Sequence, residues 1–143
     1  MPAFPSRGLD IGRGLAMLHG FPPVTAAEPP IDLEAAEIGR KLVSAEGGFS
    51  CVSCHAIGTY SAAQLFESPG INLAYSGERL LQDYFDRWMR DPLRVDPTSK
   101  MPRYFEDGTS PLFEYYDGRA KKQIDALWQY IRLGDRMADP SAD

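Results

Sequence analysis

Long apolar runs and an excess of basic residues are both missing from this chain. No stretch of about 18 apolar residues is present that could span a bilayer. The N-terminus, MPAFPSRGLDIGRG, has neither the apolar stretch nor the small-residue cleavage site of a signal peptide. The net charge of −5 and the pI near 5.0 lack the basic footprint of nucleic-acid-binding proteins. The sequence therefore argues against a membrane-spanning helix and against a nucleic-acid partner.

Strand signals are also scarce, whereas three segments have the spacing of helices. Residues 32–45 carry acidic side chains in their first turn and basic ones later. This order of charges stabilises a helix through its dipole. Residues 79–90 and 120–133 carry apolar side chains three and four positions apart, and Asp91-Pro92 ends the earlier of the two. The 143 residues, 43% of them hydrophobic, are expected to form one compact all-α domain. The inner face of the first helix is expected to consist of Leu33, Ile38, Leu42 and Val43.

Both cysteines and one of the two histidines lie within five positions, CVSCH at residues 51–55. A thioredoxin-like redox motif would stand near a βαβ pattern, which the neighbouring sequence lacks. A zinc site normally needs four ligands, and there is no third cysteine. A buried cysteine pair or a local disulfide leaves the adjacent histidine unexplained. Attachment of a c-type haem explains the whole motif, because two thiols add across the haem vinyl groups and the next residue ligates the iron.

Spacing is the physical reason for preferring haem. Two intervening residues make one tight turn, which brings Cys51 and Cys54 to one edge of a porphyrin. His55 then directs its imidazole at the metal. The motif therefore predicts one covalently attached haem c per chain, and it requires the rest of the chain to supply an apolar pocket and a second axial ligand.

Met101 is the best candidate for the second axial ligand. It lies in TSKMPRYF, a segment without periodicity, and Pro102 keeps its backbone out of the α region. Met89 belongs to the apolar stripe of a helix, where packing is the expected role, and Met137 lies in a polar tail. His19, in AMLHGFPP, is the rival ligand, because a haem with two histidine ligands would need it.

The region from residue 33 to residue 134 resembles the class I cytochromes c, the small all-α electron carriers. In that family a helix with a glycine precedes C-x-x-C-H and crosses a C-terminal helix that carries an aromatic residue. Gly39 in EIGRKLV, and Leu127 with Tyr130 in DALWQYIR, match these positions. Met101, which a proline follows, matches the ligand loop of the family. The segments GINLAYSGERL, WMRDP and MPRYF are similar to haem modules of large multidomain bacterial proteins.

This resemblance implies a cytochrome c fold, in which the N- and C-terminal helices cross around one covalently bound haem. His55 and Met101 would ligate the iron. The family often has Gly-Pro-Asn-Leu after the haem motif, and this chain has Pro-Gly-Ile-Asn-Leu at residues 69–73. The backbone carbonyl of Ile71 would then replace the proline carbonyl that accepts the proton of the proximal histidine. The side chains expected to line the haem are Leu73, Leu80, Tyr84, Trp88, Tyr104 and Phe105, with Arg79 or Trp88 as donor to a propionate.

A haem whose two axial positions are both taken by side chains has no site left for oxygen, peroxide or substrate. The expected function is therefore one-electron transfer between redox partner proteins or domains, and not catalysis. The alternative is a haem enzyme or gas-sensing module with a labile distal ligand. Bacteria attach c-type haem outside the cytoplasmic membrane, so the resemblance implies a periplasmic protein, or one that an anchor or a parent protein tethers to the membrane.

The first 31 residues are expected to be separate from the haem domain. They end in the Pro-rich linker PPVTAAEPP. Residues 10–20 (DIGRGLAMLHG) share Ile, Gly, Arg, Leu and a final Gly in register with residues 37–47 (EIGRKLVSAEG). This similarity is either the remnant of a neighbouring module or a chance likeness of two amphipathic stretches. The expected division is an extension at 1–31, a cytochrome c domain at 32–135 and a polar tail at 136–143.

Overall fold

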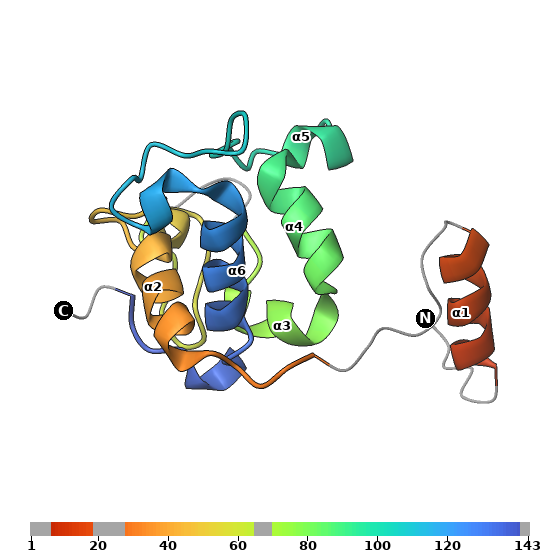
Figure 1. The fold of residues 1–143 in the computed structure, drawn as a ribbon. Coiled ribbons are helices and arrows are strands. Elements are labelled where there is room, and N and C mark those ends of the chain that lie inside the picture. Colours follow the sequence, from red (N-terminus) through yellow and green to blue (C-terminus); the bar gives the residue numbers. More distant parts are fainter. Residues whose placement is uncertain (1–6, 19–27, 65–69, 141–143) are drawn as a thin grey trace. The chain divides into compact units, whose positions relative to one another are not determined.

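The computed structural model describes residues 7–18, 28–64 and 70–140 (Figure 1). Helix accounts for 52% of them and no strand forms within these ranges, which confirms the all-α class. No helix in these ranges is long and apolar enough to cross a bilayer. The chain divides into two compact units, Met1–Pro30 and Ile31–Asp143.

The second unit is built on the pairing of α2 (Leu33–Val43) with α6 (Ala120–Ile131), which lie side by side in Figure 1. Asp32 begins α2, because its carboxylate accepts hydrogen bonds of 3.0 Å from two backbone N–H groups of the first turn. The two helices cross at Gly39, where a Cβ atom would overlap the backbone carbonyl of Ala126. The crossing therefore depends on a residue without a side chain.

The buried faces of both helices follow the predicted stripes with one exception. Leu33 was expected on the inner face of α2, but its side chain is 68% exposed. That expectation was wrong, because Leu33 is the first residue of the helix and α2 turns Ala36 and Gly39 to the core. The predicted side chains that are at most 2% exposed are Leu42, Val43, Ile124, Leu127, Trp128 and Ile131.

The helix predicted at residues 79–90 is divided in two. α3 (Ser76–Arg79) is a single short turn, and α4 (Gln82–Arg90) begins after a break. Leu80 and Leu81 form the break, with extended ψ angles of 154° and 145°. Their apolar side chains kept the spacing of a helix, so the sequence pattern did not reveal the interruption.

α4 lies along α6 in the second unit (Figure 1). It buries Phe85 and Met89, and the ring of Phe85 packs against that of Trp128 with centroids 5.3 Å apart. Asp91 then caps α5 (Pro92–Val95), accepting a hydrogen bond from a backbone N–H of that turn. The packing of Phe85 on Trp128 thus holds α4 in place ahead of the predicted ligand loop.

The helix α1 (Gly8–Leu18) lies in the first unit, and none of its residues is buried. Gly12, which aligns with Gly39 in the repeated pattern, has open space where a side chain would stand. The similarity between the two segments is thus present in the sequence but not in the packing. The large apolar side chains of α1, all more than half exposed, are Leu9, Ile11, Leu15, Met17 and Leu18.

Residues 107–118 form an irregular loop that Gln123 fastens to α6. The Gln123 side chain is fully buried. Its amide oxygen accepts from the hydroxyl of Ser110 at 2.7 Å, and its amide nitrogen donates to the carbonyls of Leu112 and Tyr115 at 2.8 and 2.7 Å. One buried amide thus orders a loop whose purpose the sequence did not explain.

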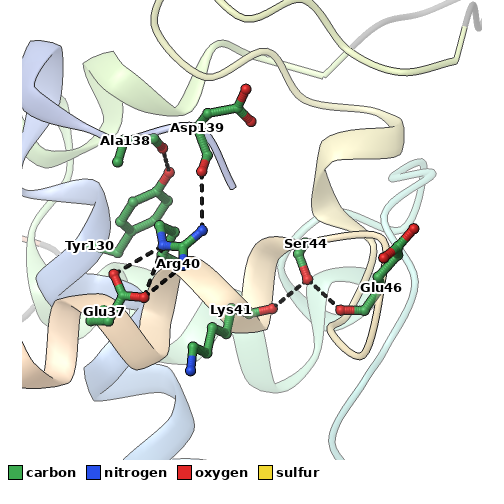
Figure 2. Close-up of polar contacts among 8 residues, drawn as sticks. All are labelled: Glu37, Arg40, Lys41, Ser44, Glu46, Tyr130, Ala138 and Asp139. Atoms are coloured by element: carbon green, nitrogen blue, oxygen red, sulfur yellow. Dashed lines mark hydrogen bonds and ion pairs between the residues drawn. The ribbon is translucent and has the colours of Figure 1, made fainter. Parts of the chain in front are cut away.

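The end of the described chain packs back on the α2–α6 pair. Met137, expected in a polar tail, is only 7% exposed and belongs to the core. A single apolar side chain thus anchors a segment that is otherwise polar. Figure 2 shows the polar contacts beside it: the Tyr130 hydroxyl donates to the carbonyl of Ala138, and Arg40 donates to that of Asp139 at 3.2 Å. The described 3₁₀ turns of the second unit are η1 (Cys51–Ser53), η2 (Leu73–Tyr75), η3 (Tyr116–Gly118) and η4 (Gly134–Arg136), the last of which follows α6.

Candidate functional site

CVSCH forms one closed turn. The backbone N–H groups of Cys54 and His55 lie 3.1 and 2.9 Å from the carbonyl oxygen of Cys51. Ser50 enters the turn with a left-handed backbone, at φ 62°. The tight turn that the two-residue spacing predicted is therefore present, and the backbone of the motif is fixed by its own hydrogen bonds.

The two thiols are not joined in a disulfide. Cys51 is buried, and burial raises the pKa of its thiol to about 12. Cys54 is half-buried. Since the thiolate is the nucleophile in disulfide exchange, Cys51 is a poor exchange group near neutral pH. The surroundings of Cys51 thus disfavour a thioredoxin-like role for the motif.

His55 is oriented through one ring nitrogen. Its Nδ1 lies 2.8 Å from the backbone carbonyl oxygen of Ile71. Because a carbonyl only accepts, Nδ1 carries the proton and donates it, which leaves Nε2 of the neutral ring with a lone pair. Gly70 lies against the ring so closely that a Cβ atom there would overlap it. Metal-ligating histidines are commonly oriented in this way by a carbonyl on the second nitrogen.

Asn72 fixes the segment that supports His55, a role that the sequence interpretation missed. Its Oδ1 accepts from the backbone N–H of Gly58 at 2.9 Å, and its Nδ2 donates to the carbonyl of Gly58 at 2.8 Å. Two further backbone hydrogen bonds of 2.9 Å join residues 70–73 to residues 54–56. The asparagine in PGINL was the available signal, because asparagine side chains readily bond to nearby backbone groups.

Met101 lies in the irregular stretch after α5, half-buried against the core. Its backbone N–H donates to the hydroxyl of Ser99 at 3.2 Å, and its sulfur accepts a hydrogen bond of 3.0 Å from the indole of Trp88. Met89, by contrast, is 4% exposed and packs in the core. The structure therefore separates a fully buried methionine from one that is half-buried and bonded to an indole.

The segment after Met101 lies close to the cysteines of the motif. Phe49, two residues before the motif, packs on Tyr104 and Phe105 with ring centroids 4.8 and 5.3 Å apart. Burial raises the pKa of Tyr104 to about 12, and the charge that Cys51 and Cys54 would carry when ionised adds to the rise. Phe105 is 3% exposed and belongs to the core. The predicted ligand loop and the CVSCH turn are thus joined through one aromatic cluster.

The other residues expected around a haem are placed unequally. The side chain of Ile71 is 61% exposed, so its backbone carbonyl is the part that contacts the site. Arg79 is exposed, with its guanidinium 5.2 Å from the centre of the Tyr75 ring. His19 lies outside the described residues. The expected lining residues that are half-buried are Leu73, Leu80, Tyr84, Trp88 and Tyr104.

An open cleft of about 800 Å³ lies beside His55. Its walls include Glu37, Arg40 and Lys41 of α2, and Met101 is not among its lining residues. Because these walls carry several charges, the cleft is not the apolar haem pocket that the sequence predicted.

Comparison of the chain with protein-family models, with curated proteins and with solved structures found no significant match. The relation to the class I cytochromes c remains a resemblance carried by the motifs. A functional proposal for this chain depends on the geometry at residues 51–55, 70–74 and 101–105.

Proposed function

We propose that the second unit is an electron-transfer domain that carries one covalently attached c-type haem. The observation that carries the proposal is the support of His55, whose Nδ1 is held 2.8 Å from the Ile71 carbonyl while Gly70 lies against its ring. The same turn presents two thiols that are not in a disulfide. A redox pair or a structural cysteine pair would need no histidine oriented in this way. A zinc site would need a fourth ligand, and no third cysteine is present. The donor set fits a c-type haem.

Four side chains would hold the haem. Cys51 and Cys54 would form the thioether bonds to its vinyl groups, His55 would supply Nε2 as one axial ligand, and Met101 would supply its sulfur as the other. When bound, the haem supplies one-electron redox chemistry at its iron. A thioether ligand favours the ferrous form and raises the reduction potential.

A carrier function follows from the two axial side chains. With both axial positions taken, the residues of this chain leave no coordination site for a substrate, so we propose an electron carrier or an electron-transfer domain of a larger redox protein rather than an enzyme. Its partners would be redox proteins or domains that exchange single electrons with it. Because bacteria attach c-type haem outside the cytoplasmic membrane, we place its function on the periplasmic side.

Co-expression with a bacterial system for c-type haem attachment is expected to yield one haem per chain that resists extraction. Thioether bonds survive unfolding, whereas a haem held by coordination alone is released. Haem staining of a denaturing gel and the alkaline pyridine spectrum, taken after acid–acetone extraction, measure the outcome. Haem recovered in the organic phase would contradict the proposal.

Replacement of the cysteines provides the control for this experiment. Cys51→Ala and Cys54→Ala should each keep one thioether bond, and the pyridine spectrum should shift to longer wavelength because one vinyl group stays conjugated with the ring. The double variant should lose the haem stain on the gel. Equal staining of all three variants would show that the cysteines are not the attachment points.

Removal of residues 1–31 is expected to leave haem ligation unchanged. All predicted site residues lie in Ile31–Asp143, and a Pro-rich linker should transmit little structure to them. The absorption spectrum, reduction potential and melting temperature of residues 32–143 are to be compared with those of the full chain. A lower melting temperature alone is compatible with the proposal, because the deletion also removes Ile31, which packs against the core. A changed spectrum would restore His19 as a ligand.

A further inference from the structure

The indole of Trp88 makes a hydrogen bond in which the chemistry of the two groups determines the donor and the acceptor. Its Nε1–H donates to the sulfur of Met101, with nitrogen and sulfur 3.0 Å apart. An indole nitrogen is a donor only, and a thioether sulfur is an acceptor only. The sequence had suggested Trp88 as a donor to a haem propionate. In this arrangement its single N–H is instead directed at the predicted axial ligand.

The donor side of this contact stands on a rigid element. Trp88 belongs to α4, where its ring is stacked with that of Tyr84 at a centroid distance of 6.2 Å and an interplanar angle of 24°. The same helix is held to α6 by Phe85, whose ring packs on Trp128. Met89, the next residue, is buried in the core. The indole therefore stacks on a residue of its own helix, and that helix is anchored to α6.

The side chain of Met101, whose sulfur accepts this hydrogen bond, is intrinsically flexible. Met101 lies outside regular secondary structure, and the described hydrogen bond of its backbone N–H runs to Ser99. A methionine side chain has several rotatable bonds, so the backbone alone does not determine where the sulfur points. The Trp88 indole is thus a directional contact on the thioether, besides its packing against the core.

We propose that Trp88 is the positioning residue of the distal ligand, and that its N–H tunes the reduction potential. This inference rests on the proposed haem function. A thioether sulfur has two lone pairs, so it can bind iron with one and accept the indole N–H with the other. The hydrogen bond withdraws electron density from the sulfur, which makes it a weaker donor to ferric iron and raises the potential. Hydrogen bonds to ligand atoms from outside the coordination shell tune metal sites in this way.

The test compares haem-loaded wild-type protein with Trp88→Phe, which removes the N–H and keeps an aromatic ring. The variant should have a lower reduction potential and should retain the weak far-red band of sulfur-to-iron charge transfer. If Trp88 had only a structural role, the variant would have a lower melting temperature or a weaker far-red band. It would not combine a lower reduction potential with a retained band. Met89→Leu, a volume-conserving change next to Trp88, is the control and should keep the wild-type potential.

A second measurement keeps the inference testable if Trp88→Phe fails to fold. The chain has two tryptophans, so ferrous haem-loaded protein labelled at the indole nitrogens should give two N–H signals. In Met101→His, which removes the sulfur and keeps an axial ligand, hydrogen exchange at Trp88 should be about three- to tenfold faster, the factor of one net hydrogen bond. Trp128, which is 1% exposed, should exchange at an unchanged rate.

The outcomes separate this inference from the function on which it rests. Wild-type protein without the far-red band or without covalent haem would overturn the proposed function itself. Wild-type protein with the band, together with a Trp88→Phe potential or a Trp88 exchange rate that does not change, would overturn the role of Trp88 and leave the function standing.

Discussion

Haem-loaded Met101→Leu is expected to lose the far-red charge-transfer band, to have a lower reduction potential and to bind added imidazole at least about tenfold more tightly. In the wild-type protein imidazole must first displace the thioether, so its apparent affinity is reduced by the small fraction of molecules with an open site. Leucine has nearly the volume of methionine, so the change removes the sulfur with little effect on packing. The ferric absorption spectrum, a redox titration and an imidazole titration measure these effects.

Met89→Leu is the matched control, because Met89 is the buried methionine of α4 and not a predicted ligand. It should retain the band, the potential and the wild-type affinity for imidazole. If the two variants exchange properties, the ligand assignment is wrong. Wild-type protein that already lacks the band and binds imidazole tightly would favour the alternative of a haem module with a labile distal ligand.

The second large effect is expected from Gly39→Ala, which should destabilise the domain. A Cβ atom at Gly39 would overlap the carbonyl of Ala126 and would lie 2.8 Å from the Cβ of Tyr130. Relief of this overlap requires α2 and α6 to move apart, at a cost of about 1–3 kcal/mol or more. The melting temperature of a domain of this size should fall by roughly 4 °C for each kcal/mol. Thermal unfolding followed by circular dichroism measures the loss.

Gly14→Ala provides the matched control, because Gly14 also lies within a helix, but a Cβ atom added there would meet no other atom within 4 Å. The same substitution there should not lower the melting temperature. Equal losses in the two variants would show that the effect belongs to glycine replacement in general and not to the helix crossing.

The long helices could be predicted from the sequence because their signals are local. The apolar stripe of residues 120–133 and the acidic start at Asp32 depend on positions a few residues apart, and both correspond to helices in the structure. The break at Leu80 and Leu81 could not be predicted, because it keeps the helical spacing of apolar side chains. Burial of Met137 was equally hidden, since the residues around it in the sequence are polar.

The candidate site was partly predictable for a similar reason. The turn at residues 51–55 follows from the spacing of the cysteines, and its chemistry follows from residue types. The Ile71 carbonyl contact was expected from the resemblance, and the structure contains that contact. The roles of Asn72 and of the Trp88 indole depend on the meeting of segments that are 13 or more positions apart. Short-range sequence patterns do not predict such contacts.

The pairing of α2 with α6 also has a consequence for the order of folding. The backbone N–H of Asp32 donates to the side chain of Gln129, 97 positions away, so this pair closes almost the whole domain into one loop. Closing a loop of that length has an entropic cost whose length-dependent part is roughly 4 kcal/mol of free energy. This cost arises before the contacts between the helices can offset it. Non-local pairing of this kind slows folding. The cysteines, the His55 support and the Met101 loop all lie inside that loop. Cys51 and Phe105 share one core with α2 and α6, so the burial of this core is complete only when the two ends of the domain have met.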